Sequence, residues 1–499
     1  MIKLLDCTLR DGGYYTNWDF DSNLVLKYLK YMETLPVEYL EVGYRSIEND
    51  GYFGEYYYLP LETLQFIKSN SSKKIAIMLN SKEYDNKIDL SLLDNLKDYV
   101  DLVRLATDPS KIKVALKLAK EIKKKGFKVA INIMYISKIN KNNDFYEYLT
   151  TINEHVDILN LVDSYGSIYP EKLKELILEI KCKSNISLGF HGHNNLELAF
   201  INTLTAINLG IDYVDSTILG MGRGAGNLKT ELILTYLKSN QIIDIDLNPL
   251  GKLSDTFKPL LDKYNWGTNL AYMVSGGYSL QQKNVMDALE IDRYSLSGII
   301  SHIKNGEDTI LAKLTNDKQF KSSIIIGGGN SIKNHIDAIL RYLSANHEIL
   351  VIHSTSKYIR YFENIKNTQY FAVAGDELLK LDSSIKYIEK YILEPTPRKI
   401  KTRFDDTNNF YELKNISFID KYFDSPLTIS LQIMITMNIQ NINLIGFDGY
   451  KELKSKKELY LMTENQNIID SFITKNKLTS LTDTQYDNLE KSSIYGVIS

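Results

Sequence analysis

Short apolar runs alternate with longer amphipathic segments through the first half of the chain. A short apolar run bounded by polar or glycine residues predicts a buried strand, whereas apolar residues repeating every three or four positions predict a helix. The predicted strands are Lys3–Asp6, Tyr39–Val42, Ile75–Leu79, Leu102–Leu105, Val129–Ile133, Ile158–Val162, Ile186–His191 and Tyr213–Thr217. Amphipathic stretches such as Ser110–Lys125 and Leu196–Leu209 predict helices between them. This pattern fits a (β/α)8 barrel in both size and order.

Polar residues able to carry chemistry stand where three of these strands end. Asp11 lies in a predicted polar turn, Thr8–Gly13, after the first strand. His191 ends the seventh strand, and the glycine-rich segment Gly220–Asn227 follows the eighth. A doubly wound sheet would also alternate strands with helices, but it would not bring its first, seventh and eighth strands together. These strands are neighbours only if the sheet closes. The motif spread therefore favours a barrel with a site at the carboxyl ends of its strands.

The spacing of His191 and His193 points both imidazoles to the same face of a strand, because strand side chains alternate. With Asp11 they predict a metal site with open positions for a substrate, and Asn227 is a candidate fourth ligand. Such a site suits Mg²⁺, Mn²⁺ or Co²⁺ as well as Zn²⁺, so the identity of the metal stays open. A metal held there could chelate a 2-oxoacid and withdraw charge as a Lewis acid.

Three motifs carry a family resemblance: Leu4–Gly13, His191–Asn195 and Gly220–Asn227. In order and spacing they resemble the signatures of the metal-dependent TIM-barrel lyases and aldolases. That superfamily includes 4-hydroxy-2-oxoacid (pyruvate) aldolases, 3-hydroxy-3-methylglutaryl-CoA lyases and isopropylmalate synthases. The resemblance covers roughly the first 300 residues. It implies that Arg10 stabilises the enolate formed on carbon–carbon cleavage and that Ser164 contacts the substrate carboxylate; a helix N-cap is the alternative for Ser164.

Two departures from the family pattern bear on the substrate. Three residues after the motif aspartate, the hydroxy-oxoacid aldolases carry a histidine that serves as acid and base, whereas this chain has Tyr14. A tyrosine, with a pKa of about 10, is a poor base at neutral pH but can act as a proton donor. The 3-hydroxy-3-methylglutaryl-CoA lyases carry a cysteine in the loop before the final asparagine, and Gly220–Asn227 has none. This second departure disfavours the CoA-lyase interpretation.

Arg45 follows the second predicted strand at the same end of the barrel. It is a candidate for holding a carboxylate or phosphate of the carbonyl partner, or else pairs with a neighbouring acid. Arg104, inside the fourth predicted strand, is expected to form a salt bridge in the barrel interior or at its rim.

The length of 499 residues predicts more than one domain. We expect residues 1–245 to form the barrel, 246–318 a helical extension and 319–499 a second, Rossmann-like α/β domain. A net charge of −3 gives no reason to expect nucleic acid as a partner, and no apolar run approaches membrane-spanning length. Two cysteines cannot form a disulfide framework, so a reducing cytoplasm and no signal peptide are expected.

In the second predicted domain, strands are expected at Ser323–Ile326, Ile349–Ile352, Gln369–Val373 and Asn441–Ile445. The first of these strands precedes a glycine-rich turn and an amphipathic helix. Such a strand, turn and helix form a phosphate cradle in many nucleotide-binding folds. The candidate nucleotide-binding residues are Gly327, Gly328, Gly329, Asn330 and Ser331. Together with Ile442–Gly449, this turn resembles nucleotide-sugar-handling domains of bacterial surface-glycan proteins, although it lacks the G-x-G-x-x-G spacing. A turn without a ligand is the alternative.

These observations predict a metal-dependent aldolase or lyase that acts on a pyruvate enolate and an aldehyde or keto compound. The resemblance of the second domain places it in bacterial surface-sugar biosynthesis as a bifunctional enzyme, with a nucleotide or nucleotide sugar as second ligand. One alternative is an acyl-CoA-dependent Claisen enzyme of the isopropylmalate-synthase kind. Another is a non-catalytic nucleotide- or glycan-binding protein. A homo-oligomer is expected.

Overall fold

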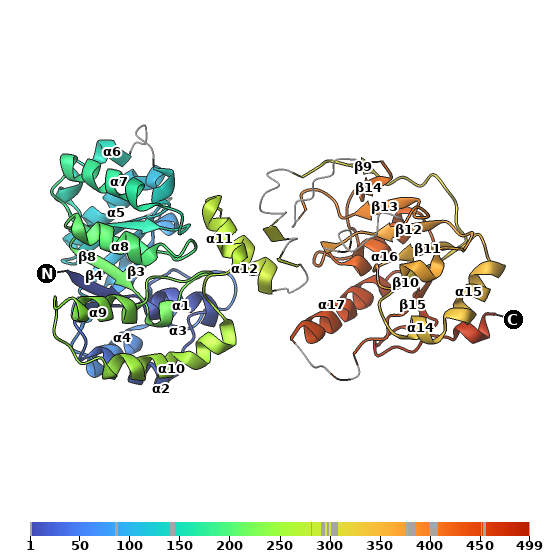
Figure 1. The fold of residues 1–499 in the computed structure, drawn as a ribbon, viewed down its shortest axis with the longest axis horizontal. Coiled ribbons are helices and arrows are strands. Elements are labelled where there is room, and N and C mark those ends of the chain that lie inside the picture. Colours follow the sequence, from blue (N-terminus) through green and yellow to red (C-terminus); the bar gives the residue numbers. More distant parts are fainter. Residues whose placement is uncertain are drawn as a thin grey trace. The chain divides into compact units, whose positions relative to one another are not determined.

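The chain forms two compact units, residues 1–286 and 287–499. The computed structural model describes residues 2–84, 88–139, 145–280, 282–290, 295–296, 299–300, 308–375, 377, 385–398, 408–450, 452 and 456–498. In Figure 1 the first unit runs from blue to yellow-green and the second from yellow to red. The division falls within the predicted helical extension of residues 246–318.

The first unit is a closed barrel of eight parallel strands, which confirms the predicted fold. The strands are β1 (Lys3–Asp6), β2 (Val37–Tyr44), β3 (Lys74–Asn80), β4 (Leu102–Thr107), β5 (Lys128–Ile133), β6 (Ile158–Asp163), β7 (Ser187–Gly192) and β8 (Tyr213–Ser216). Strand β1 pairs with β2 on one side and β8 on the other, and this double pairing closes the sheet. Closure brings the ends of β1, β7 and β8 together, as the motif spread predicted.

Helices surround the barrel and continue after its last strand. They are α1 (Thr8–Thr16), α2 (Ser22–Met32), α3 (Glu55–Tyr58), α4 (Leu61–Asn70), α5 (Ile112–Lys124), α6 (Phe145–Tyr148), α7 (Pro170–Lys183), α8 (Ala199–Asn208), α9 (Thr230–Ser239), α10 (Asn248–Tyr264), α11 (Leu270–Gly277) and α12 (Gln282–Glu290). Helix α5 is typical: it buries Ile112, Leu118 and Ile122 against the barrel and exposes its lysines. Burying each of these apolar side chains contributes about 1.5–3 kcal/mol.

The segment Thr8–Gly13 is helical, where the sequence predicted a polar turn. Helix α1 begins at Thr8 and buries all six residues of the segment. It includes two glycines because its surroundings leave no room for side chains: a Cβ on Gly12 would approach the Met221 sulfur to 2.6 Å, and one on Gly13 would overlap the Trp18 ring. This close packing fixes α1, and with it Asp11, over the carboxyl ends of the barrel strands.

The second unit is a parallel sheet of nine strands in the order β17-β16-β15-β10-β11-β12-β13-β14-β9. The strands are β9 (Ala312–Lys313), β10 (Ser322–Ile326), β11 (Leu350–His353), β12 (Gln369–Ala372), β13 (Lys390–Leu393), β14 (Phe410–Glu412), β15 (Asn441–Ile445), β16 (Thr479–Ser480) and β17 (Glu490–Lys491). From β10 the chain builds outward on one side, and β15 then pairs on the other side of β10. Strands β10 and β15 therefore border the point where the strand order reverses.

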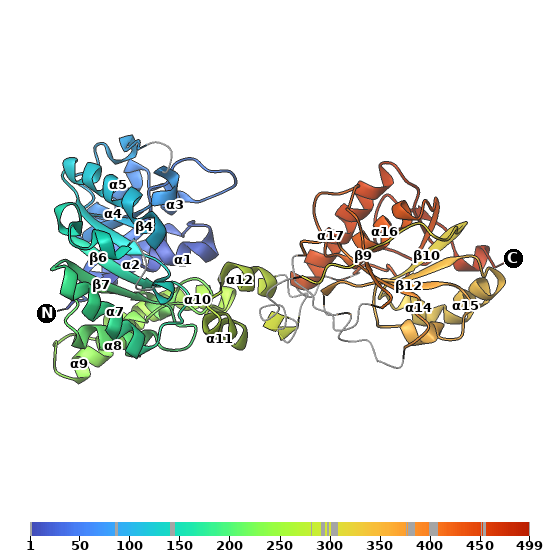
Figure 2. The same cartoon turned by 90° about the horizontal axis from the view of Figure 1, so that it is seen from above.

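Helices cover both faces of this sheet, which explains why its central strands are apolar throughout. They are α14 (Ser331–Asn334), α15 (Ile336–Ala345), α16 (Pro426–Thr436) and α17 (Lys456–Ile473). Ile324 and Ile326 pack in one apolar cluster with residues of α14 and α15, whereas Ile325 packs in another with residues of α16 and α17. Figure 2 shows the two pairs of helices on opposite faces. Among the described residues, no helix has both the length and the apolar content to span a membrane.

Candidate functional site

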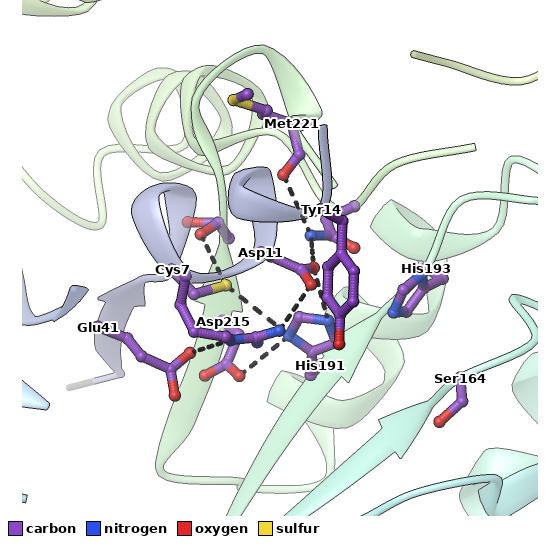
Figure 3. Close-up of polar contacts among 12 residues, drawn as sticks. Cys7, Asp11, Tyr14, Glu41, Ser164, His191, His193, Asp215 and Met221 are labelled. Carbon is purple, nitrogen blue, oxygen red and sulfur yellow. Dashed lines mark hydrogen bonds and ion pairs between the residues drawn. The ribbon is translucent and has the colours of Figure 1, made fainter. Parts of the chain in front are cut away.

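Three predicted ligands meet at the carboxyl ends of the barrel strands. Asp11 comes from α1, His191 from β7, and His193 from the residue that follows β7. One ligand atom from each lies within 4.8 Å of the others, and the three residues are 1–3% exposed. Figure 3 shows the Asp11 carboxylate and both imidazoles turned toward a shared space.

Neighbouring side chains orient both histidines. The Nδ1 atom of His191 is 3.1 Å from the Asp215 carboxylate, while its Nε2 atom is 3.7 Å from Oδ2 of Asp11. A carboxylate on Nδ1 holds the proton there and leaves Nε2 as the basic nitrogen. The Nδ1 atom of His193 is 3.3 Å from the amide nitrogen of Gln282. His191 is thus anchored through Nδ1 with its Nε2 atom toward Asp11, and Gln282 holds the His193 ring in place.

Asp11 and His193 have the protonation states that a cation requires. Burial raises the pKa of the Asp11 carboxyl, but the neighbouring Arg10 guanidinium and the two histidines outweigh burial and hold that pKa well below its usual value. Burial and the nearby His191 lower the pKa of His193 to about 3. Because metal ligands must be deprotonated, these shifts mean that protons compete weakly for the two residues at neutral pH.

Asn227 completes the donor set. Its Nδ2 atom donates to Oδ2 of Asp11, while its Oδ1 atom is buried and has no hydrogen-bond partner among the described residues. A buried amide oxygen without a partner is costly, and a cation would satisfy it. The loop that carries Asn227 fits closely here, because a Cβ on Gly222 would lie 3.0 Å from Asp11. The residues present therefore fit a divalent cation.

A second group, Cys7, His191 and Asp215, also has metal-like spacing. Its ligand atoms are already engaged: Oδ2 of Asp215 accepts from Arg104 at 2.5 Å and from Asn160 at 3.1 Å. Burial raises the pKa of the Cys7 thiol well above its usual value, so it stays protonated. This second group supports His191 rather than forming another metal site.

Arginines and carboxylates alternate beneath the candidate metal site. Arg10 donates to Asp11 at 2.6 Å and to Glu41 at 2.9 Å, and Arg104 pairs with Glu41 at 3.1 Å and with Asp215 at 2.5 Å. Arg104 is 2% exposed, which confirms the predicted salt bridge in the barrel interior. The network holds the Arg10 side chain beside Asp11, where the resemblance places the enolate-stabilising residue.

Tyr14 lies at the open side of the cluster. Its hydroxyl is 3.1 Å from the Tyr44 hydroxyl, and the Arg223 guanidinium lies over its ring at 4.4 Å. Burial, then the adjacent Tyr14, raises the pKa of Tyr44 well above its usual value, so Tyr44 stays protonated. Tyr44 can donate to Tyr14 and leave the Tyr14 hydroxyl proton directed elsewhere.

Ser164 is brought near the site, but Arg45 is bonded elsewhere. Ser164 accepts a hydrogen bond from the backbone N–H of Tyr135 at 2.9 Å. It does not cap helix α7, whose N-cap is Tyr169, so the N-cap interpretation is wrong. Arg45 donates to the backbone carbonyls of Tyr58, Leu59 and Leu92 at 2.7–2.9 Å. The Arg45 guanidinium thus links the loops that carry these three carbonyls. The geometry gives no support to a role of Arg45 in holding substrate.

Four residues of the site were not predicted from the sequence: Glu41, Asp215, Arg223 and Gln282. The two carboxylates interrupt apolar strands, a signal that could have marked them as partners of a buried cation. Arg223 stands inside the glycine-rich motif but was not singled out. Gln282 contacts His193 and Asn195 from α12, and nothing in its local sequence indicates this.

Three of the five predicted nucleotide-binding residues, Gly327, Gly328 and Gly329, border a cavity in the second unit, and Asn330 and Ser331 do not line it. The cavity has a volume of about 360 Å³ and is lined by Gly327–Gly329 after β10 and Gly446–Tyr450 after β15. The turn itself uses its donors internally: the N–H groups of Gly327 and Gly329 bond to backbone carbonyls. Ser331 donates through its N–H to Asp448 at 2.9 Å and also through its hydroxyl. The Asp448 carboxylate thus takes the place expected for a phosphate, and nucleotide binding stays a prediction.

Comparison with known proteins places this geometry in a family. The HMGL-like family model matches residues 103–256. The oxaloacetate decarboxylase of Mycobacterium tuberculosis is 26% identical over 249 residues, which are 49% of this chain and 73% of that protein. The 4-hydroxy-2-oxovalerate aldolase of Geobacillus thermodenitrificans is 28% identical over 249 residues, 47% of this chain and 69% of that protein.

A solved structure extends the comparison to a larger share of the chain. The N-terminal domain of a candidate aldolase from Bacteroides vulgatus is 49% identical, with a TM-score of 0.57, and the match covers 60% of this chain and 99% of that domain. The chain therefore belongs, through its N-terminal barrel, to the HMGL-like family of TIM-barrel aldolases and lyases.

Proposed function

We propose that the barrel forms or cleaves a carbon–carbon bond between the enolate of pyruvate and an aldehyde or keto compound, as a metal-dependent, class II-type aldolase. Asp11, His191 and His193 would hold the cation, with Asn227 as the fourth ligand. When bound, a divalent cation at these residues supplies a Lewis acid that draws charge from the oxygens of a 2-oxoacid. Mg²⁺, Mn²⁺, Co²⁺ and Zn²⁺ remain the candidate cations.

Arg10 is the proposed stabiliser of the enolate oxygen. Its guanidinium has five N–H groups, of which two are used by Glu41 and Asp11. The backbone at Arg10 is also fixed, because the Trp18 indole donates to its carbonyl at 2.8 Å. A cation held rigidly in a dry site stabilises developing negative charge without reorganising, which is the basis of oxyanion stabilisation.

Tyr14 is the proposed proton donor to the carbonyl partner, and Ser164 the proposed contact of the pyruvate carboxylate. The Tyr44 hydroxyl is positioned to donate a hydrogen bond to Tyr14 and so orient the Tyr14 proton. Ser164 accepts from a backbone N–H and therefore has its own proton to give to a carboxylate. Together these residues would fix both ends of the 2-oxoacid before the bond is made or broken.

The observation that carries this proposal is the buried Asp11, His191 and His193 cluster beside Arg10. It is tested by incubating the protein with 4-hydroxy-2-oxovalerate or oxaloacetate and measuring released pyruvate with lactate dehydrogenase. We expect release that requires a divalent cation and stops on chelation, with Asp11→Asn as the inactive control. Release from oxaloacetate alone would assign decarboxylation instead, and thiol release from acetyl-CoA with a 2-oxoacid would assign the Claisen alternative. No turnover under any condition would leave a binding protein.

For the second unit we propose binding of a nucleotide or nucleotide sugar, which would make the protein bifunctional and place it in surface-carbohydrate synthesis. The supporting observation is the cavity at the reversal of strand order, where parallel α/β sheets bind ligands. Since the glycine turn offers few free N–H groups, we expect the sugar or base, rather than a phosphate, to lie against it.

A cavity-filling variant tests this second proposal. A Cβ on Gly328 would meet its nearest neighbour, Thr355, only at 3.8 Å, so Gly328→Leu adds bulk at the cavity wall without a backbone clash. Gly496, which has open space around it, provides the matched control Gly496→Leu. We expect a uridine, cytidine or guanosine nucleotide or nucleotide sugar to raise the melting temperature of the wild type and the control but not of Gly328→Leu. If none of these nucleotides or nucleotide sugars raised the melting temperature of the wild type, nucleotide binding by the second unit would be contradicted.

A further inference from the structure

Arg223 differs from the other arginines of the first unit because, among the described residues, it makes no hydrogen bond or ion pair to a carboxylate or carbonyl, although it interacts with Asp11 through space. Four arginines occur in residues 1–286, and all four are described. Arg10 and Arg104 are paired with buried carboxylates, and Arg45 with backbone carbonyls. The Nε atom of Arg223 is buried, and among the described residues it has no hydrogen-bond partner. Its guanidinium lies over the face of the Tyr14 ring, 4.4 Å from the ring centroid.

The loop around Arg223 is held rigidly over the site. Asn227, four residues on, bonds to Asp11, and the carbonyl of Gly224 accepts from the Tyr15 hydroxyl at 3.3 Å. A Cβ on Gly224 would overlap Gln282, so α12 packs directly against this loop. The guanidinium is therefore held beside Tyr14 in a fixed position, and both residues are half-buried.

Arg223 has a buried donor that the described residues leave without a partner. Arg10 and Arg104 each make two short ion pairs with the carboxylates of Asp11, Glu41 and Asp215. The buried Nε atom of Arg223 makes no hydrogen bond to a described residue, and a buried donor without a partner is unfavourable. An anionic group held against Arg223 would satisfy this donor.

We propose that Arg223 binds a carboxylate or phosphate group on the carbonyl compound that reacts with the pyruvate enolate, and so selects anionic carbonyl partners. This inference rests on the proposed aldolase function. The planar fork of an arginine suits both kinds of anion.

The test compares paired aldehydes that differ in charge. Pyruvate is condensed with glyoxylate or glycolaldehyde phosphate, which are anionic, and with acetaldehyde or glycolaldehyde, which are neutral. We expect the wild type to react faster with one of the two anionic aldehydes than with its neutral counterpart. The aldehyde that is preferred shows whether Arg223 binds a carboxylate or a phosphate. Arg223→Gln should lower kcat/KM for that class by about 10- to 100-fold, the loss expected for one charge-assisted hydrogen bond, with little change for neutral aldehydes. Arg223→Lys should retain part of the preference for anionic aldehydes. The control Lys138→Gln removes a positive charge that contacts Tyr165 instead, and it should retain the whole preference.

Pyruvate exchange separates this proposal from the one it rests on. Exchange of the pyruvate methyl protons needs no carbonyl partner, so Arg223→Gln should leave its rate and its KM unchanged. A raised KM for pyruvate, or equal losses with charged and neutral aldehydes, would overturn the proposal. Failure of the wild type to exchange would instead contradict the aldolase function.

A binding measurement tests Arg223 without turnover. Phenylglyoxal modifies accessible arginines, and peptide mapping follows the Gly220–Asn227 segment. Inorganic phosphate or glyoxylate should slow the labelling of Arg223 in the metal-loaded protein, while acetaldehyde should not. Labelling that neither anion affects would contradict an anion site at Arg223.

Discussion

Replacing Asp215 by asparagine isolates what the buried carboxylate does for the metal site. All three donors that reach Asp215 converge on one oxygen, Oδ2: Arg104 at 2.5 Å, Asn160 at 3.1 Å and His191 Nδ1 at 3.1 Å. An asparagine has nearly the same shape and can place its carbonyl oxygen where Oδ2 stood. The substitution therefore keeps the hydrogen-bond geometry and removes the negative charge.

The structure sets the size of the expected effect. Hydrogen bonds to a charged group contribute about 1.5–3 kcal/mol, and neutral ones about 0.5–1.5 kcal/mol. Arg104 keeps its second carboxylate, Glu41 at 3.1 Å, so the loss is smaller than for a broken buried pair. We expect Asp215→Asn to lower the free energy of unfolding by about 2 kcal/mol. A less basic His191 should weaken metal binding by about 10- to 100-fold, as for other carboxylates behind a ligating histidine.

Calorimetric titration with Mn²⁺ and thermal unfolding measure the two effects separately. Asp163→Asn is the matched control: Asp163 is also buried at this end of the barrel and interacts with His191 through space, but its hydrogen bonds come from the backbone N–H groups of Ser167 and Ile168. We expect the control to bind Mn²⁺ like the wild type. Equal Mn²⁺ affinity in Asp215→Asn and the wild type would refute the reasoning, and so would equal weakening in both variants.

Three further predictions concern the site, the packing and the response to pH. Arg10→Gln should bind metal but lose turnover by about 10²- to 10³-fold, as for other oxyanion donors; unchanged turnover would remove Arg10 from the mechanism. Gly13→Ala should lower the free energy of unfolding by about 2 kcal/mol or more, because its methyl group would overlap Trp18. Gly251→Ala, in open space on α10, should leave that free energy unchanged. Denaturant unfolding followed by tryptophan fluorescence measures both values, and equal stability of the two variants would contradict the prediction. Burial lowers the pKa of His353 to about 4 from 6.5. The unfolded chain therefore takes up a proton first, and stability of the second unit should fall by up to about 3 kcal/mol as the pH drops from 6.5 to 4. Hydrogen exchange of the β11 peptide, corrected for intrinsic rates, measures this loss, and a pH-independent value in that window would contradict it.

The sequence predicts the central strands well because each is short, apolar and bounded by polar residues. Strands β1 and β15 have their predicted bounds, Lys3–Asp6 and Asn441–Ile445. The outer strands β9, β13, β14, β16 and β17 are absent from the predicted set. They have two to four residues, and some carry buried charges such as Glu412, which pairs with Arg398. A charged residue in so short a segment gives no strand pattern.

The metal ligands could be predicted because each stands in a local motif at a strand end. Their supporting residues depend on contacts that only the closed barrel creates. Asp215 on β8 contacts His191 on the adjacent strand β7, and Gln282 contacts His193 from a helix that follows the barrel. Arg45 was predicted in the site because it ends a strand at the correct face, but its guanidinium bonds to loop carbonyls that no local pattern reveals.

Proton exchange of pyruvate tests the central claim most directly, because it needs neither the carbonyl partner nor the second unit. The protein is incubated with pyruvate in D₂O, with Mg²⁺ or Mn²⁺ or after chelation, and the methyl signal is followed by NMR after the metal is removed. We predict exchange that requires the cation, is absent in Asp11→Asn and is strongly slowed in Arg10→Gln. Exchange that persists in metal-free protein, or in Asp11→Asn, would contradict enolate formation at the Asp11, His191 and His193 site.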